Sequence, residues 1–392
     1  MELKKEVESY AEEVIELRRD FHKHPELGFE EVRTSKVVAN YLKGCGIEVE
    51  RVAKTGIVGL LKGKQDGPTI LLRADMDALP IQEMNDVPYK SVNEGVMHAC
   101  AHDGHTAMLL VAAKILSQHR NDLKGNIKFV FQPNEEWSGA RDMIDEGILN
   151  DPDVDVAFAS HLWTPIESGK VAISAGPVMG ALDEFKLVIK GQGGHTSAPQ
   201  EAIDPILTVA NIIQTTQMIQ TREVNVLKPT LVMFGKINGG TTSNVIPEEV
   251  EVEGTIRYLY KGGKDSEERP KERFERIVSD VCRTHRAEYE LEFIPSNSVV
   301  YNRPETTELV REVAEDVMGD SISIIDYVAM GGEDFSEFLE EVPGVFYFIG
   351  TGNEEKETDY PHHHPRFNID EDTLITGVEM HVRTALAYLN DS

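Results

Sequence analysis

The sequence is poor in cysteine, in positive charge and in long apolar runs, and each shortage disfavours a class of protein. Three cysteines in 392 residues are too few and too dispersed for a disulfide framework, so we expect a reducing, cytoplasmic compartment. No apolar run approaches the length of a membrane span, and the charged N-terminal segment lacks the apolar region of a signal peptide. Lys and Arg total 39 against 68 Asp and Glu, and a net charge of −29 disfavours partners such as nucleic acid or anionic membranes.

The remaining composition is that of an ordinary folded protein, and the length favours two domains. Hydrophobic residues make up 40% of the chain and charged residues 27%. A chain of 392 residues is long for a single core. Strand-like segments alternate with helix-like segments up to about residue 182, with strands near 69–72, 126–131 and 154–159. This alternation predicts an α/β fold, with a mixed sheet and helices on both faces.

The pattern changes between residues 183 and 296. Glu184–Lys190 alternates with the period of a strand that is buried on one face. The following segments predict the order βαββαβ, which is typical of a ferredoxin-like α+β sheet with two helices. We therefore expect residues 183–296 to form an inserted lid or dimerisation domain, and residues 1–182 with 297–392 to form a discontinuous catalytic domain. The further elements are expected near 202–220 (helix), 230–237 and 250–260 (strands), 268–285 (helix) and 288–294 (strand).

Side chains that can bind metal stand where strands appear to end or helices to begin. Taken singly, each is more typical of a core or surface residue, but together they match a hydrolytic site for two metal ions. Such a site directs a metal-activated water at a carbonyl group. The members of this set are Cys100, His102, Glu135, Glu136, His161 and His363.

The acidic side chains of this set have specific uses. Adjacent carboxylates repel, so the pair Glu135-Glu136 is stable if a cation binds one of them, and the other can then take a proton from water. A solvated acidic loop is the alternative. Asp75 and Asp77 follow a predicted strand, where they either orient a metal-binding imidazole or cap a turn or helix.

A glycine-rich segment in the inserted domain ends in a histidine. Gly191–Ser197 lacks the Lys-Ser/Thr of a phosphate-binding loop, so nucleotide binding is not indicated. Its glycines either permit a turn with positive φ, or they present His195 as a donor to a developing oxyanion.

Several motifs, in order from about Leu17 to Leu389, resemble the M20 metallopeptidase family. The closer likeness is to its amidohydrolase branch, which includes aminoacylases, hippurate hydrolases, auxin-conjugate hydrolases and N-acetyl-diaminopimelate deacetylases. The motifs are Leu72–Pro80, Met97–His105, Phe131–Glu136, Ser160–Trp163, Gly193–His195, Asn244–Pro247, Gly254–Arg257, Met330–Phe335 and His363–Phe367.

The resemblance implies a function and a role for each matching residue. It implies hydrolysis of the amide bond of N-acyl-L-amino acids by two divalent metal ions per subunit (zinc, manganese, cobalt or nickel). The small lid would often also form a homodimer or homotetramer. Glu135 would be the general base and acid, and His195 would stabilise the oxyanion, either within one subunit or across a dimer. Asn244 and Arg257 would hold the substrate carboxylate. The implied metal ligands are Cys100, His102, Glu136, His161 and His363, the last flanked by His362 and His364.

The chain departs from the family pattern in two places. Other functions also stay open. Ala101 and the pair Trp137-Ser138 replace residues that are usual in relatives; neither change removes a ligand, and Trp137 can reshape the substrate pocket. A carboxypeptidase or dipeptidase would use the same site, whereas a silent metal- or ligand-binding protein would not need Glu135. A cysteine hydrolase would pair Cys100 with His102 or His105, and it would resist a chelator.

Overall fold

The computed structural model describes residues 2–261, 268–319 and 322–391, and these pack as two compact units. The first unit holds residues up to 178, 301–328 and from 334 onward, and the second holds Met179–Val300 and Ala329–Glu333. The predicted boundaries assign Ala329–Glu333 to the catalytic domain, but this short segment packs with the second unit. Among the described residues, no helix combines the length and the apolar character needed to cross a membrane.

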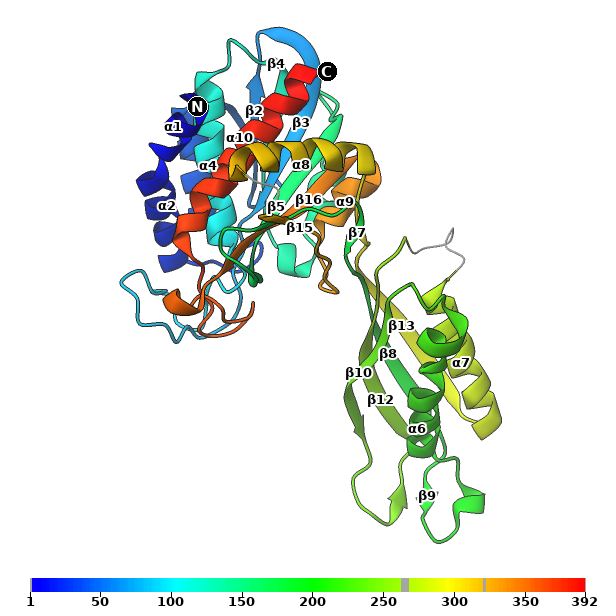
Figure 1. The fold of residues 1–392 in the computed structure, drawn as a ribbon. Helices are drawn as coiled ribbons and strands as arrows, with labels where there is room; N and C mark the ends of the chain where they lie inside the picture. The colour runs from blue at the N-terminus through cyan, green and yellow to red at the C-terminus, as the bar shows by residue number, and fades with distance from the viewer. Residues whose placement is uncertain (1, 262–267, 320–321, 392) are drawn as a thin grey trace. The chain divides into compact units, whose positions relative to one another are not determined.

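The first unit contains an eight-stranded mixed sheet, as predicted (Figure 1). Its order is β1-β2-β4-β3-β5-β16-β6-β15. The central strands β4, β3, β5 and β16 are parallel, so their carboxyl ends meet at one edge, where α/β sheets place their sites. The strands are β1 (Glu48–Val52), β2 (Gly56–Lys62), β3 (Gln65–Asp75), β4 (Lys124–Gln132), β5 (Val156–Glu167), β6 (Val171–Ala172), β15 (Ile324–Ile325) and β16 (Gly344–Gly352).

Helices cover both faces of this sheet, which confirms the predicted layers. Alternate strand residues such as Leu72 and Phe158 share a core with helix α4, and Phe158 meets Tyr388 of α10 edge to face. The intervening residues face the other side, where Phe346 packs against Phe335 of α9. The first face carries α1 (Glu2–Glu8), α2 (Ala11–Lys23), α3 (Val32–Gly44), α4 (His102–Gln118), α8 (Pro304–Met318) and α10 (Leu374–Asp391), and the second carries α5 (Ala140–Asp145) and α9 (Phe335–Glu341).

Strand β5 is longer than the sequence pattern predicts. The apolar run suggests a strand over 154–159, but β5 continues to Glu167. Its partner β3 stops pairing at Ala159, whereas β16 on the other side pairs with it as far as Glu167. His161 therefore lies within a strand that extends beyond its neighbour, and its side chain stands at the edge of the sheet.

The second unit contains the predicted βαββαβ arrangement. Its strands are all antiparallel, in the order β10-β12-β8-β13, and α6 and α7 pack together against the sheet. Helix α6 begins later than expected because Asp204 caps it, accepting from the amides of Ile206 and Leu207. The elements are β8 (Ala181–Lys190), β9 (Gly194–His195), α6 (Pro205–Thr216), β10 (Thr230–Gly239), β11 (Val245–Ile246), β12 (Glu249–Tyr258), α7 (Pro270–His285) and β13 (Glu288–Asn297). The chain enters through β7 (Gly176–Met179) and leaves through β14 (Val300–Asn302).

Candidate metal centre

The segment that carries Cys100 and His102 is an irregular loop that runs into α4. Ala101 between them has φ of 67°, in the left-handed region that favours glycine. Further along, a Cβ added to Gly104 would lie 2.5 Å from Leu162 Cδ1. Glycine therefore lets α4 lie close to β5, next to His161.

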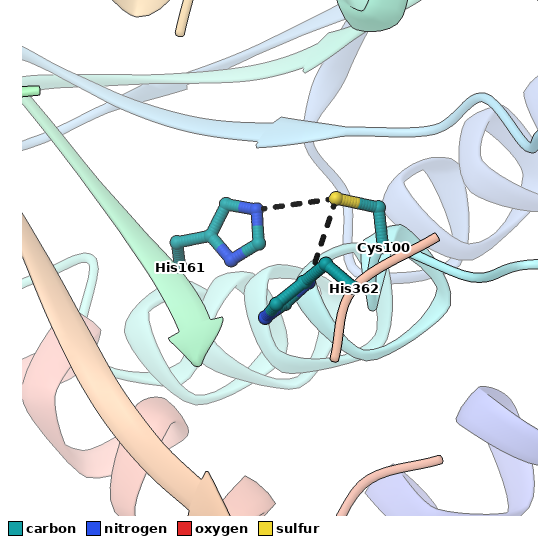
Figure 2. Close-up of side chains that lie close together, drawn as sticks. All are labelled: Cys100, His161 and His362. Carbon is teal, nitrogen blue, oxygen red and sulfur yellow. Dashed lines mark hydrogen bonds between the residues drawn. The ribbon is translucent and has the colours of Figure 1, made fainter. Parts of the chain in front are cut away.

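Three side chains from separate parts of the chain meet at this point. Figure 2 shows Cys100 from the loop before α4, His161 from β5 and His362 from the loop after β16. Cys100 Sγ lies 3.6 Å from His161 Nε2 and 3.7 Å from His362 Nδ1. The ring of His362 also stacks on Trp163, with ring centroids 4.3 Å apart. Sulfur and imidazole nitrogen within this range form a donor set suited to zinc-like divalent ions.

The hydrogen bonds of two histidines leave one ring nitrogen of each available for metal. His102 Nδ1 lies 2.9 Å from the carbonyl oxygen of Asp77, and His161 Nδ1 lies 2.9 Å from that of Leu162. A carbonyl only accepts, so in the neutral ring, the form that binds metal, each Nδ1 carries the proton and each Nε2 keeps its lone pair. His102 Nε2 is buried and has no hydrogen-bond partner among the described residues, while His161 Nε2 faces Cys100.

In His105 and His362, by contrast, a backbone amide occupies the lone pair of Nε2. The amide of Leu162 donates to His105 Nε2 at 2.9 Å, and His105 Nδ1 lies 2.7 Å from Asp75 Oδ1, so both nitrogens are used. The amide of Thr164 donates to His362 Nε2 at 3.3 Å. A neutral His362 therefore carries its proton on Nδ1, the nitrogen that faces Cys100 Sγ, and this nitrogen is then not available as a metal ligand.

Glu135 and Glu136 lie on one tight turn, and a buried carboxyl group binds the backbone next to that turn. The 3-10 turn Glu135–Trp137 is flanked by Asn134 with φ of 54° and Ser138 with φ of 63°. The amide of Asn134 donates to the buried carboxyl of Glu31 at 2.9 Å. Burial raises the pKa of Glu31 to about 7, although hydrogen bonds from Thr55 and Asn134 oppose the rise. Glu31 thus supports the turn that presents the pair, and no motif in the sequence predicts this role.

The two carboxylates of this turn approach different histidines. Glu135 Oε2 lies 3.7 Å from His102 Nε2, and Glu136 Oε1 lies 3.2 Å from His363 Nε2. Cys100, His102 and Glu136 offer ligand atoms within 4.8 Å of one another. The structure thus brings the predicted ligands together, with His363 next to Glu136 and His362 next to Cys100.

The two predicted supporting aspartates contact different partners. Asp77 Oδ1 lies 3.1 Å from His102 Nδ1, and Asp77 Oδ2 accepts from the amide of Glu136 at 3.1 Å. Asp75 Oδ1 instead accepts a hydrogen bond from His105 Nδ1, and Asp75 Oδ2 lies 3.8 Å from His102 Nε2. Asp77 therefore orients one candidate ligand and the backbone of another.

The charges around the centre indicate a site built for a cation. Burial lowers the pKa of His102, but Asp75, Asp77 and Glu136 outweigh this effect and raise it to about 10. Burial, with the neighbouring acidic pair, raises the pKa of the Cys100 thiol well above its usual value. A buried thiol of this kind is a poor nucleophile by itself, which argues against the cysteine hydrolase.

Unpartnered atoms provide the test of whether metal fits this site. Within the described residues, the buried His102 Nε2 has no hydrogen-bond partner, and the buried Glu136 Oε1 has only its 3.2 Å ion-pair contact with His363 Nε2. Leaving buried polar atoms unsatisfied costs about 1–3 kcal/mol each. A divalent cation would satisfy both atoms, and the donors around them are sulfur, imidazole nitrogen and carboxylate oxygen, so the residues fit a metal centre.

The remaining predicted residues lie in the second unit. The amide and hydroxyl of Ser197 lie 3.1 and 2.8 Å from His195 Nδ1, so this nitrogen accepts and the exposed Nε2 carries a proton. Val245, next to Asn244, pairs with His195 in the small β9-β11 sheet. Arg257 lies on β12, where its guanidinium donates to the carbonyl of Met330 at 3.0 Å.

A buried ion-pair network beneath the centre has no counterpart in the sequence prediction. Arg73 on β3 donates to Asp75 at 2.7 Å and to Asp334 at 3.0 Å. Asp334 also accepts from Gln132 and from the amide of Ala140. The network connects β3, β4 and the start of α9, and it becomes visible only when these segments are brought together.

Comparison with known proteins decides the family. The profile of peptidase family M20/M25/M40 matches residues 71–387. The chain belongs to this family. It is therefore an M20-family hydrolase, and its relatives include amidohydrolases and dinuclear metal-binding peptidases.

Individual relatives cover nearly the whole chain. Thermostable carboxypeptidase 2 of Saccharolobus solfataricus is 39% identical over 99% of this chain and 98% of its own length. N-acetylcysteine deacetylase of Bacillus subtilis is 36% identical, covering 96% of this chain and 97% of the relative. A crystal structure of a dinuclear metal-binding M20 peptidase from Bacillus subtilis aligns with a TM-score of 0.83 and 34% identity, covering 98% and 99% of the two chains.

Proposed function

We propose that this M20 hydrolase cleaves the amide bond of N-acyl-L-amino acids, releasing a carboxylic acid and an amino acid. The observation that carries the proposal is the position of Glu135, whose carboxylate lies 3.7 Å from the unpartnered His102 Nε2. A base at the edge of a candidate metal centre is what amide hydrolysis by water needs. Relatives named N-acetylcysteine deacetylase and IAA-amino acid hydrolase support the acyl-amino-acid class.

We assign Cys100, His102, Glu136, His161 and His363 as ligands of two divalent ions of the zinc, manganese, cobalt or nickel kind. His363 is preferred to His362 because its Nε2 lies 3.2 Å from Glu136 Oε1, whereas His362 directs a protonated nitrogen at Cys100. When bound, such ions polarise the substrate carbonyl and lower the pKa of water.

This assignment predicts different metal contents for two neighbouring variants. His363→Ala should lose a large part of the bound metal, because a ligand is removed. His362→Phe should keep it, because an aromatic ring retains the stacking on Trp163 while no ligand is lost. Metal per subunit, measured by inductively coupled plasma mass spectrometry after gel filtration, checks both. Metal loss in His362→Phe with full occupancy in His363→Ala would reverse the assignment.

The protein's own groups account for the proton transfers. Glu135 accepts a proton from the attacking water and delivers it to the leaving nitrogen, so that the amine departs neutral. His195 donates its Nε2 proton in a hydrogen bond to the carbonyl oxygen as negative charge develops there. Asn244 and Arg257 are proposed to hold the carboxylate of the amino-acid half, for which a guanidinium is suited through bidentate pairing.

The dimensions of the second unit support a homodimer or homotetramer formed through residues 183–296. His195 lies beyond the end of β8 that pairs with Glu249, because its β9 segment pairs with Val245. Arg257 lies eight residues further along β12 than Glu249, which is roughly 26 Å at the usual strand rise. One copy therefore cannot present both residues to one small substrate, and a second copy is proposed to supply one of them. Edge strand β10 exposes Leu231, Met233 and Ile237, as an interface strand would. A monomer in sedimentation equilibrium would contradict this arrangement.

A carboxypeptidase or dipeptidase is the second candidate, because a relative named thermostable carboxypeptidase 2 is 39% identical. Both substrate classes present an amide next to a free carboxylate, and the exposed Trp137 beside the acidic pair is a candidate wall of the pocket.

Free thiols at all three cysteines agree with the proposed cytoplasmic location.

A substrate panel is expected to separate the two candidates. N-acetyl and N-benzoyl amino acids should be cleaved with higher kcat/KM than dipeptides of the same C-terminal residue, because the site is proposed to accept an acyl group without a charged amine. Both kcat/KM values are measured by chromatographic detection of the released amino acid, in assays supplied with manganese, zinc or cobalt. Cleavage of dipeptides alone would assign a peptidase instead.

A further inference from the structure

Arg18 on α2 is completely buried, although it carries a charge and lies outside the proposed ligand set. Its side chain is 0% exposed, as is that of Asp103, to which its Nε donates at 2.8 Å. Its other nitrogens donate to Asn368 at 2.9 Å and to Glu371 at 3.1 Å. Asp103 follows His102 in the first turn of α4, and Asn368 follows His363 by five residues. One guanidinium therefore joins both segments that carry proposed ligands.

His22, one turn further along α2, reinforces the same connection. Its Nδ1 lies 2.8 Å from Asp103 Oδ2, and its Nε2 lies 3.2 Å from Glu83 Oε1. Next to Glu83, the amide of Met84 donates to the carbonyl of Pro365 at 2.8 Å. Burial favours the neutral form of Asp103, but Arg18 and His22 hold its pKa well below the usual range. The contacts form a continuous buried brace between α2, α4 and the 365–371 segment.

The two braced segments also meet directly at the metal centre. The amide of His363 donates to the carbonyl of Ala99 at 2.9 Å, immediately before Cys100. Ala101 and His363 both have positive φ, at 67° and 65°. Non-glycine residues in this region cost about 1–2 kcal/mol each, so the surrounding contacts must hold the backbone there.

We propose that Arg18 is a positioning residue that holds the Cys100–Asp103 and His363–Glu371 segments in the geometry required for divalent metal binding. The proposal rests on the ligand assignment of the proposed function. Arg18 cannot contact substrate, because it is fully buried. A role in stability alone is a weaker explanation, since buried ion pairs contribute little net stability relative to apolar replacements. Asp103, Glu371 and Asn368 lie in three directions around the side chain, and only the planar guanidinium of an arginine can donate to all of them.

Arg19 provides a matched control. It is the next residue on α2 and makes an ion pair with the same Glu371, at 2.5 Å, but it is 46% exposed. No contact from it to Asp103 or Asn368 is found in the described part of the chain. Arg19→Met therefore removes a neighbouring positive charge and the bidentate contact of Arg19 with Glu371, and leaves the brace to α4 intact.

The experiment measures binding of zinc alone to the metal-free full-length protein, by competition with a chromogenic chelator. Loss of groups that orient metal ligands typically weakens metal binding by about 10- to 100-fold. The zinc affinity of Arg18→Met should be weaker than that of the parent by a factor in this range. Arg18→Lys should have an intermediate zinc affinity, because a lysine keeps the charge but cannot contact all three partners. Arg19→Met should bind zinc as tightly as the parent protein. The visible spectrum of the cobalt-substituted protein should change in Arg18→Met and not in Arg19→Met.

Near-ultraviolet circular dichroism of the metal-free proteins identifies variants that are not folded. If Arg18→Met does not fold, Arg18→Lys decides the question through its zinc affinity and cobalt spectrum. Parental affinity and spectrum in a folded Arg18 variant would overturn the proposal, as would an equal loss in Arg19→Met. Failure of the parent protein to bind zinc or cobalt would contradict the proposed function instead, so the two failures are distinguishable.

Discussion

Glu135→Gln is expected to lower kcat by about 10²- to 10⁴-fold while metal content stays at the parental level. The amide has the size of the carboxylate but cannot accept a proton, so water activation and protonation of the leaving nitrogen both fail. Glu135 lies 3.7 Å from His102 Nε2, and no ligand role is assigned to it. Steady-state kinetics on an N-acetyl amino acid, with metal analysis of the same sample, provide the measurement.

Glu136→Gln is the matched control for this experiment. It changes the adjacent residue in the same way, but it is expected to reduce metal content because Glu136 is assigned as a ligand beside His363. Near-normal turnover by Glu135→Gln would remove Glu135 from the mechanism. Loss of metal from Glu135→Gln with retention by Glu136→Gln would exchange the two roles.

Removal of metal by a chelator is expected to abolish turnover, and addition of manganese, zinc or cobalt should restore it. Without a cation, His102 Nε2 remains without a hydrogen-bond partner among the described residues, and burial keeps the Cys100 thiol protonated. The site then has no means of polarising a carbonyl or activating water. Activity measured after dialysis against chelator, and again after each metal is supplied, checks this.

Cys100→Ala is the control that links this loss of activity to the site. We expect this variant to hold less metal and to recover little turnover when metal is supplied, because a thiolate ligand is missing. A protein that keeps full turnover in chelator but is inactivated by alkylation of Cys100 would instead be a cysteine hydrolase.

The layered fold was predictable because its signals are local. Alternating apolar segments in the first unit and period-2 segments such as Glu184–Lys190 indicate strands before any tertiary contact is known. The length of β5 was not predictable, because pairing with β16 extends it through Pro165 to Glu167. Extension of that kind depends on a partner almost two hundred residues away.

The grouping of the candidate metal ligands was partly predictable, but which ring nitrogen of each histidine carries the proton was not. His102, His105 and His362 are equivalent as letters in a motif. The structure separates them by the backbone groups that their ring nitrogens meet: a carbonyl for His102, and amides for His105 and His362. Arg18 and Glu31 are far in sequence from the candidate ligands that they support, and neither residue belongs to a recognisable motif. Their role depends on being buried next to Asp103 and Asn134.

The hydrogen bonds at His195 fix which of its ring nitrogens can act as a donor. The amide of Ser197 donates to Nδ1, so a neutral ring carries its proton on Nε2. The tautomer that the proposed donor to the oxyanion needs is therefore set within its own turn, by a residue two positions further along the chain, rather than by a distant part of the fold.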